Sequence, residues 1–190
     1  MLDVAVAAAR SAAAIIRAAA ADPGALQVRT KQANDFVTQV GLASEQASVR
    51  TLLDAYPGHA VRSEESLHTH GAPGAEHVWI VDPLDGTTNF LHSNPMFAVS
   101  IGLEREGQLV AGVIYNPATD ELYTAEKGKG AYMNDRRVRV AARKTLADAL
   151  LTTGIPHRGR QGHPRFLNEM EVLMRCLLYT SAAADDLPRV

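Results

Sequence analysis

The residues best equipped for chemistry are Asp82 and Asp85, which border a run of small residues, Gly86–Thr88. Pro83 disfavours helical geometry at Asp82, and glycine allows a backbone to approach a ligand closely. If a helix begins here, its free amides attract anions such as phosphate, and Asp85 or Thr87 can cap it. Carboxylates repel an anion unless a cation lies between them. The segment therefore predicts a divalent cation held against a phosphate.

The ligand type narrows the choice of cation. Carboxylate oxygens are hard ligands that select Mg²⁺, Mn²⁺ or Ca²⁺. Mg²⁺ typically uses one or two carboxylates, together with waters and substrate phosphate. A third acidic element lies upstream at Glu64 and Glu65. A glutamate there can complete a metal site or position an attacking water, whereas the alternative for this pair is a solvated loop.

Two predicted strands lead into these acidic residues. Trp79–Val81 has the β-branched and aromatic composition of a buried strand, and Asp82 stands at its end. His59–Arg62 is expected to form a short strand that enters the turn carrying Glu64. The loop that follows contains His68 and His70, a candidate metal pair for which a solvated loop is the favoured interpretation, because no further ligand lies nearby in sequence.

The remaining pattern predicts an α+β fold, with an antiparallel sheet and two N-terminal helices packed on one side of it. Helices are expected over 2–21, which Asp22-Pro23-Gly24 ends, and over 41–56, where apolar residues recur at i, i+3, i+4 and i+7. Expected strands and a final helix follow at 97–103, 109–115, 121–125, 131–140, 150–153 and from 163 onward. Asn134 and Asp135 are predicted to form a hairpin tip.

Residues 82–90 run Asp-Pro-Leu-Asp-Gly-Thr-Thr-Asn-Phe, and this stretch matches the signature of the inositol monophosphatase family of Mg²⁺-dependent phosphatases. Residues 63–66 resemble the family's Gly-Glu-Glu-Ser turn, with Ser63 in place of the glycine. Residues 31–38 resemble its early Asp-x-Val-Thr segment, and residues 127–131 its Lys-Gly-x-Gly-Ala hairpin. The resemblance covers about residues 1–175 and implies the N-terminal half of a layered αβαβα sugar-phosphatase fold.

The resemblance also implies a metal-assisted reaction. Glu64, Asp82 and the backbone carbonyl of Leu84 are implied to bind one Mg²⁺, and Asp82 and Asp85 to share a second. Glu64 and Thr87 are implied to orient and activate the attacking water. The implied reaction is the hydrolysis of inositol 1-phosphate or a related sugar phosphate by in-line attack, in which metals stabilise the attacking and leaving oxygens.

Substrate contacts are implied for Asp85, Gly86, Thr87 and Thr88, with the amides of Gly86 and Thr87 holding phosphate oxygens. The expected substrate is a small phosphorylated polyol or sugar. Related phosphatases that act on 3′-phosphonucleotides, fructose bisphosphate or histidinol phosphate share the metal core, so the residues leave the particular monoester open. Complete members of the family commonly form homodimers, and a homodimer is therefore expected for the complete protein.

Two departures from the family pattern motivate an alternative function. Gly41 stands where the family has an aspartate that supports the metal–water network. Trp79 is the only tryptophan, so the family's C-terminal Trp-Asp segment, which supplies a further metal ligand, is absent. The alternative is a C-terminally truncated and catalytically inactive fragment, or a protein that binds metal or a partner in the transcription machinery.

Residues 176–190 do not continue the family pattern. They are similar to a translated sequencing adapter, which favours a non-native tail after an incomplete metal- and phosphate-binding domain of residues 1–175. The rival interpretation is that Ser181–Leu187 is a divergent version of a family helix. Resequencing the gene from source DNA distinguishes the two.

Composition is that of a soluble globular protein, with 46% apolar and 21% charged residues. A net charge of −2 gives no reason to expect a nucleic acid or an acidic membrane surface as partner. One cysteine permits no intrachain disulfide, which is typical of a reducing cytoplasm. The alanine-rich N-terminus lacks the basic start of a signal peptide, and Arg10 and Arg17 interrupt its apolar residues.

Overall fold

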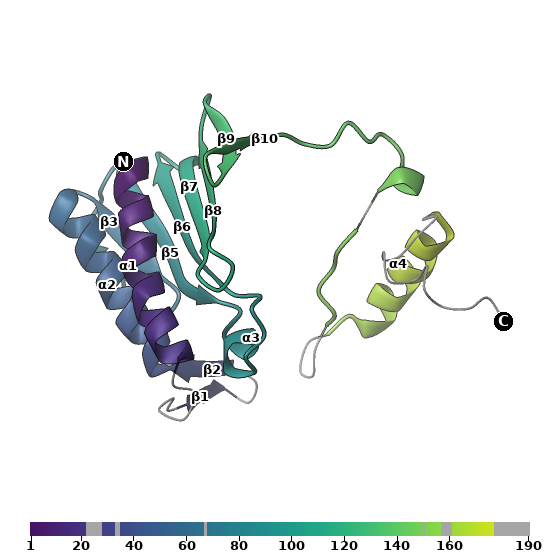
Figure 1. Ribbon diagram of the computed structural model, residues 1–190, viewed down its shortest axis with the longest axis horizontal. Coiled ribbons are helices and arrows are strands. Elements are labelled where there is room, and N and C mark those ends of the chain that lie inside the picture. The colour runs from purple at the N-terminus through teal and green to yellow at the C-terminus, as the bar shows by residue number, and fades with distance from the viewer. Residues whose placement is uncertain (22–27, 33–34, 67, 150, 157–160, 177–190) are drawn as a thin grey trace. The chain divides into compact units, whose positions relative to one another are not determined.

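The structure, a computed structural model, describes the chain except for residues 22–27, 33–34, 67, 150, 157–160 and 177–190 (Figure 1). It divides into two units, Met1–Arg139 and Val140–Val190, and each is described by itself. The first unit contains the predicted site residues. Most of the 176–190 segment, including the rival helix, lies outside the described residues.

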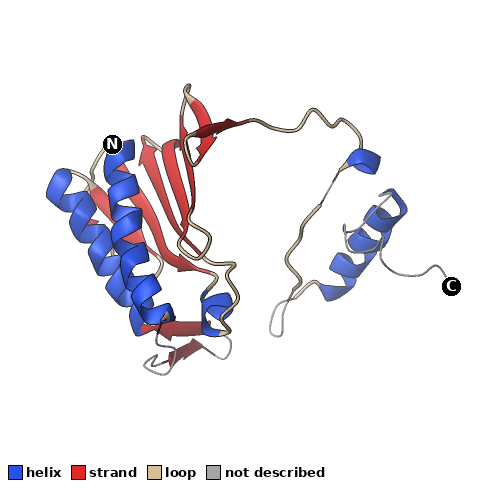
Figure 2. Ribbon diagram, viewed as in Figure 1, coloured by secondary structure: helices blue, strands red, loops and turns tan. Residues whose placement is uncertain are grey.

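Two long helices, α1 (Leu2–Ala20) and α2 (Gln39–Ala55), pack side by side against the main sheet (Figure 2). The predicted helices are thus confirmed, with ends shifted by one or two residues. Small side chains make up most of the buried face of α1, and they let the two helices and the sheet approach closely. These residues are Ala5, Ala8, Ala9, Ala12, Ala13 and Ile16. No helix in the described ranges is long and apolar enough to cross a membrane.

The main sheet has eight strands in the order β10-β9-β8-β7-β6-β5-β3-β4. Their bounds are β3 Ala60–Ser63, β4 His70–Gly71, β5 His77–Asp85, β6 Ala98–Arg105, β7 Gln108–Asn116, β8 Glu121–Glu126, β9 Gly130–Met133 and β10 Arg136–Val138. A separate two-stranded sheet pairs β1 (Val28–Gln32) with β2 (Asp35–Thr38). Neighbouring strands of the main sheet are antiparallel except for β3 and β5, which run parallel. The sheet is therefore mixed, and the parallel pair was not foreseen.

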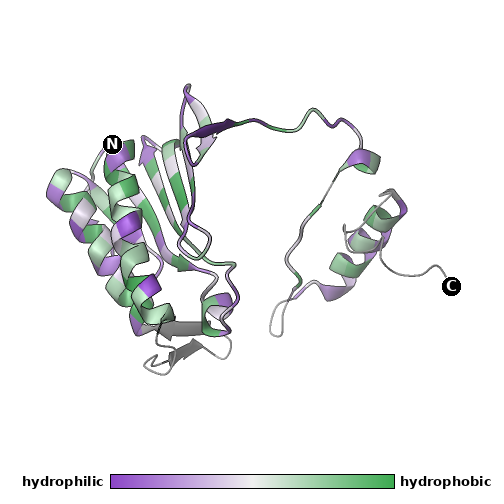
Figure 3. Cartoon of the chain, viewed as in Figure 1, coloured by the Kyte–Doolittle hydropathy of each residue, from purple (hydrophilic) through white to green (hydrophobic). Residues whose placement is uncertain are grey.

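The core lies between the helices and one face of the sheet. Alternate residues of the central strands enter it, namely Trp79, Val81, Val99, Ile101, Leu103, Val113 and Tyr115. Buried residues therefore alternate with more exposed ones along these strands, which are rich in apolar residues (Figure 3). The opposite face exposes apolar side chains at Ile80, Leu109, Ile114 and Tyr123. The α+β class and the packing of both helices on one face confirm the predicted architecture.

In the second unit, α4 (His163–Cys176) confirms the helix predicted from residue 163. A single 3-10 turn, η2, covers Leu146–Asp148. The strand predicted at 150–153 is wrong for residues 151–153, which have no regular structure, and residue 150 lies outside the described residues. A short apolar run forms a strand only when a partner strand is available for its backbone hydrogen bonds.

Candidate functional site

The parallel pairing of β3 with β5 places two predicted site residues beside each other. Ser63 pairs with Val81, and the amide of Glu64 donates to the Val81 carbonyl oxygen at 3.1 Å. Glu64 therefore follows the end of β3 where Asp82 follows Val81 in β5. These residues are distant in sequence, and the strand register is what brings their carboxylates together.

A bulge near the end of β5 shapes the turn that follows. Asp82 pairs with Ser100 and Asp85 with Ala98, so β5 has one more residue than β6 in this interval. The Leu84 amide donates to Asp82 Oδ1 at 3.1 Å, and the Thr87 hydroxyl donates to the Leu84 carbonyl oxygen at 3.0 Å. Asp82, Leu84 and Thr87 thus belong to one internally hydrogen-bonded turn, whereas Glu64 reaches the site from the end of β3.

Gly86 connects this turn to a five-residue helix, α3 (Thr87–Leu91). Its φ is +85°, and a Cβ atom here would lie 2.7 Å from the Met96 carbonyl oxygen, so the position requires glycine. Gly86 is also the N-cap, without a side-chain hydrogen bond to the helix. The expectation that Asp85 or Thr87 caps the helix is therefore wrong. The Thr87 hydroxyl instead donates to the Leu84 carbonyl oxygen.

The electrostatics of the site centre on Asp82. Burial, a hydrogen bond with Glu64, and repulsion from the carboxylates of Glu64 and Asp85 raise the pKa of Asp82 to about 7. The Leu84 amide acts in the opposite direction by stabilising the charged form. Asp82 is half-buried, whereas Glu64 and Asp85 are exposed. Because the fold gathers negative charge here, the site is suited to a cation.

The donor set fits a Mg²⁺ ion in chemistry, since it consists of carboxylate and carbonyl oxygens. Within the described part of the chain, no three Asp, Glu, His or Cys side chains are already arranged around a metal position. Glu64 and Asp85 are exposed side chains, so they can change rotamer at little cost to the fold. Glu64, Asp82, Asp85 and the Leu84 carbonyl oxygen are the groups that would hold such an ion.

An open groove of about 500 Å³ adjoins the carboxylates, a size common among small-molecule sites. Glu64 and Asp82 line it together with residues of β3, β5, β6 and β7, which include Arg62, Ser100 and Leu109. The predicted substrate residues Asp85, Gly86, Thr87 and Thr88 are not part of its lining. They lie in the adjoining turn and first residues of α3.

Of the two departures noted in the sequence, only Gly41 has a position in the structure, and it lies on α2. Gly41 is buried near the start of α2, so no carboxylate is supplied from that position. The early segment resembling the family spans β1 and β2, apart from residues 33–34, which lie outside the described residues.

Sequence reasoning missed a polar cluster formed by Glu45, Ser66 and His70. His70 was expected to lie in a solvated loop without a further partner, but it is half-buried and contacts Glu45 of α2. A charged residue on the buried face of a predicted helix, between Ser44 and Ser48, was the available signal. Its partners lie far away in sequence, so the sequence alone did not identify them.

Comparison with known proteins decides the family. A model of the inositol monophosphatase family matches residues 1–187. The chain belongs to this family. An inositol-1-monophosphatase of Rhizobium meliloti is 52% identical over 149 residues, which are 78% of this chain and 56% of the relative. The Nus factor SuhB of Pseudomonas aeruginosa is 46% identical over 162 residues, which are 85% of this chain and 60% of the relative.

Solved structures support the fold. The suppressor protein suhB of Bartonella henselae has a TM-score of 0.88 at 44% identity, over 94% of this chain and 68% of that one. Inositol monophosphatase from Anabaena has a TM-score of 0.78 at 33% identity, over 95% of this chain and 65% of that one. The family and fold class inferred from the sequence are thus confirmed. This family member spans 56–60% of the length of the two curated relatives compared above.

Proposed function

We propose that the chain carries the metal and phosphate site of a Mg²⁺-dependent phosphomonoesterase that hydrolyses inositol 1-phosphate or a related sugar phosphate. The observation that carries the proposal is the convergence of Glu64, Asp82 and Asp85. Burial, and after it the neighbouring carboxyl groups of Glu64 and Asp85, raise the pKa of Asp82 to about 7. Such crowding of carboxylates at the edge of a groove is costly unless a cation compensates it. Family membership supports the same reaction class.

In this proposal, Glu64, Asp82, Asp85 and the Leu84 carbonyl oxygen hold Mg²⁺. The bound metal supplies charge stabilisation for the attacking and leaving oxygens of the phosphate. The Thr87 hydroxyl already donates its proton to Leu84, so its lone pairs are free to accept a hydrogen bond from the attacking water. Glu64 takes the proton that the water loses as its oxygen bonds to phosphorus.

Substrate positioning falls to the turn after β5. The amides of Gly86 and Thr87, with Asp85 and Thr88, contact the phosphate and the polyol in this proposal. The absence of a side chain at Gly86 leaves the backbone accessible to the phosphate oxygens. The P–O bond to the polyol breaks opposite the attacking water, and the leaving alkoxide takes a proton from solvent. A homodimer and a cytoplasmic location remain predictions for the complete protein.

The test is phosphate release from inositol 1-phosphate over a Mg²⁺ titration, in wild type and in Asp82→Asn. The variant is expected to abolish release. Because the fold disfavours the charged form of Asp82, a neutral amide is not expected to lower thermal stability at pH 7.5. Asp54→Asn, at an exposed carboxylate of α2, is the matched control and should retain activity. Turnover that is indifferent to EDTA would contradict the proposal.

A catalytically inactive, binding function is the second candidate. Gly41 and the single tryptophan favour it, as does the relative named Nus factor SuhB, which raises the transcription machinery as a class of partner. The discriminating result is Mn²⁺ binding, measured by calorimetry, without phosphate release at any metal concentration. Saturable turnover by the 190-residue chain would exclude this candidate.

A further inference from the structure

We propose that Glu45 is a positioning residue that holds the Glu64 turn in place through a hydrogen bond with Ser66. This inference rests on the proposed function, since it assigns Glu45 and Ser66 a role in metal binding by Glu64. Neither residue belongs to the ligand set, and neither lines the groove. The cluster lies between α2 and the segment that connects β3 to β4.

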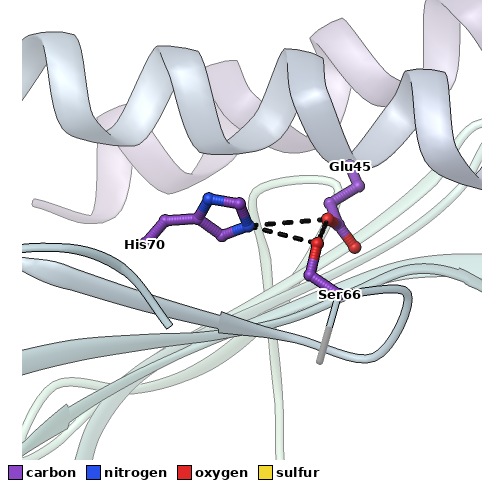
Figure 4. Close-up of polar contacts among 3 residues, drawn as sticks. All are labelled: Glu45, Ser66 and His70. Carbon is purple, nitrogen blue, oxygen red and sulfur yellow. Dashed lines mark hydrogen bonds and ion pairs between the residues drawn. The ribbon is translucent and has the colours of Figure 1, made fainter. Parts of the chain in front are cut away.

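The contacts in this cluster converge on one carboxylate oxygen (Figure 4). The Ser66 hydroxyl donates a hydrogen bond to Glu45 Oε1. His70 Nε2 lies 3.7 Å from the same oxygen and 3.2 Å from Ser66 Oγ. Glu45 is 3% exposed, and its Oε2 has no hydrogen-bond partner among the described residues.

A buried glutamate at this point of α2 is costly for stability. A carboxylate loses its hydration on burial, and apolar residues of similar volume often stabilise a core as well or better. Glu45 shares the buried face of α2 with Val40 and Leu52, which are apolar. Packing alone therefore does not account for a glutamate here, whereas its bond to Ser66 gives it a specific task.

That task concerns the turn that carries Glu64. One side of the turn is fixed where the Glu64 amide donates to the Val81 carbonyl oxygen. Ser66, two residues later, is fixed to α2 through Glu45. His70 opens β4, which pairs with β3 through Val61. The exposed Glu64 side chain thus projects from a backbone anchored on both sides, which limits the positions of its carboxylate relative to Asp82.

Serine, histidine and glutamate are also the residue types of a nucleophilic triad, but the geometry favours an anchor. In a triad, histidine takes the proton of serine with one ring nitrogen while the acid binds the other nitrogen. Here the Ser66 hydroxyl donates to Glu45, and the same His70 nitrogen faces both partners. The hydroxyl proton is therefore directed to the Glu45 carboxylate and not to the His70 imidazole.

The test compares Ser66→Ala with Ser66→Thr in the 190-residue chain. Calorimetry and the electron paramagnetic resonance of Mn²⁺ measure metal affinity without requiring turnover. Loss of residues that orient metal ligands typically weakens affinity 10- to 100-fold, and we expect about a tenfold loss in Ser66→Ala. Ser66→Thr retains the hydroxyl and should restore affinity. If turnover occurs, the Mg²⁺ requirement should rise while KM at saturating Mg²⁺ is unchanged.

Three further variants separate positioning from general stability. Ser48→Ala removes a fully buried hydroxyl of α2 that has no hydrogen-bond partner among the described residues, and it should leave Mn²⁺ affinity unchanged. Glu45→Gln keeps an acceptor for Ser66 and should lose less affinity than Glu45→Ala. Equal affinity in wild type and Ser66→Ala would overturn the inference alone. Wild-type protein that binds no Mn²⁺ would overturn both this inference and the proposed function.

Discussion

At the scale of single residues, the aromatic cluster around His59 shows how a neighbour can fix a protonation state. The Trp79 indole N–H donates to His59 Nδ1 at 3.1 Å, so that nitrogen must be unprotonated. The His59 ring also stacks between Tyr56 and His77, with ring centroids 4.7 and 4.8 Å away. Burial above all, then the His77 charge and more weakly the N-terminus, lowers the pKa of His59, while Glu76 opposes the shift.

This lowered pKa predicts a pH dependence of stability. The unfolded chain takes up a proton on His59 at about pH 6.5, before the folded chain does. The contribution of neutral His59 to stability is therefore fully present above pH 6.5. It is lost as the pH falls from 6.5 through the pKa of His59 in the folded chain. Trp79 is the only tryptophan, so its fluorescence should report a folded-state midpoint below 6.5.

Urea unfolding at pH 7.5 and 5.5 measures the same linkage in free energy. His59→Phe keeps an aromatic ring for stacking but cannot titrate, so its stability should depend less on pH than that of wild type. His77 and Asp82 are present in both proteins, so any dependence of stability on pH that comes from these two residues is common to both. An equal loss of stability in wild type and variant between the two pH values would contradict the assignment to His59.

At the scale of elements, the alanine face of α1 determines how closely the helices pack. Ala8, Ala9, Ala12 and Ala13 are fully buried. Ser44 of α2 donates a 3.5 Å hydrogen bond to the carbonyl oxygen of Ala12. A larger side chain at Ala12 has no room unless α1 moves from its neighbours, and overpacking of this kind costs about 1–3 kcal/mol.

Ala12→Leu is accordingly expected to lower the free energy of unfolding by about 1–3 kcal/mol, measured by urea denaturation. Ala14→Leu, two residues later on the exposed face of α1, is the matched control. It should change the free energy of unfolding by less than about 0.5 kcal/mol. If the two substitutions had equal effects, the close approach of α1 would not be what limits side-chain size on this helix.

The elements also differ in how far the sequence predicts them. The prediction of α2 rests on the local helical spacing of Val49, Leu52 and Tyr56, and the helix lies where it was predicted. The parallel pairing of β3 with β5 depends on partners outside either strand, and periodicity does not specify partners. The same limit applies to the site. A continuous motif predicts Asp82 and Asp85 as candidate ligands, whereas the contact of Glu45 with Ser66 arises only from tertiary packing.

At the scale of the whole chain, the two faces of the main sheet differ in their cover. Within residues 1–139, α1 and α2 cover one face, and the other exposes Leu109 and Ile114 with 65% and 49% of their surface accessible. These side chains and Tyr123 adjoin an apolar hollow of about 300 Å³ on β6 to β10. An apolar surface of this kind promotes association with other apolar surfaces.

The 190-residue polypeptide is therefore expected to bind the dye ANS and to self-associate as its concentration rises, measured by dye fluorescence and sedimentation velocity. Ile114→Glu places a charge at the centre of this surface and should reduce both signals. Leu167→Glu removes an apolar residue of α4 that is more exposed than Ile114, 64% against 49%, and should leave both signals nearly unchanged. A monomer that does not bind ANS would show that this face is covered in solution. An equal response to both variants would show that association depends on total exposed apolar area and not on this face of the sheet.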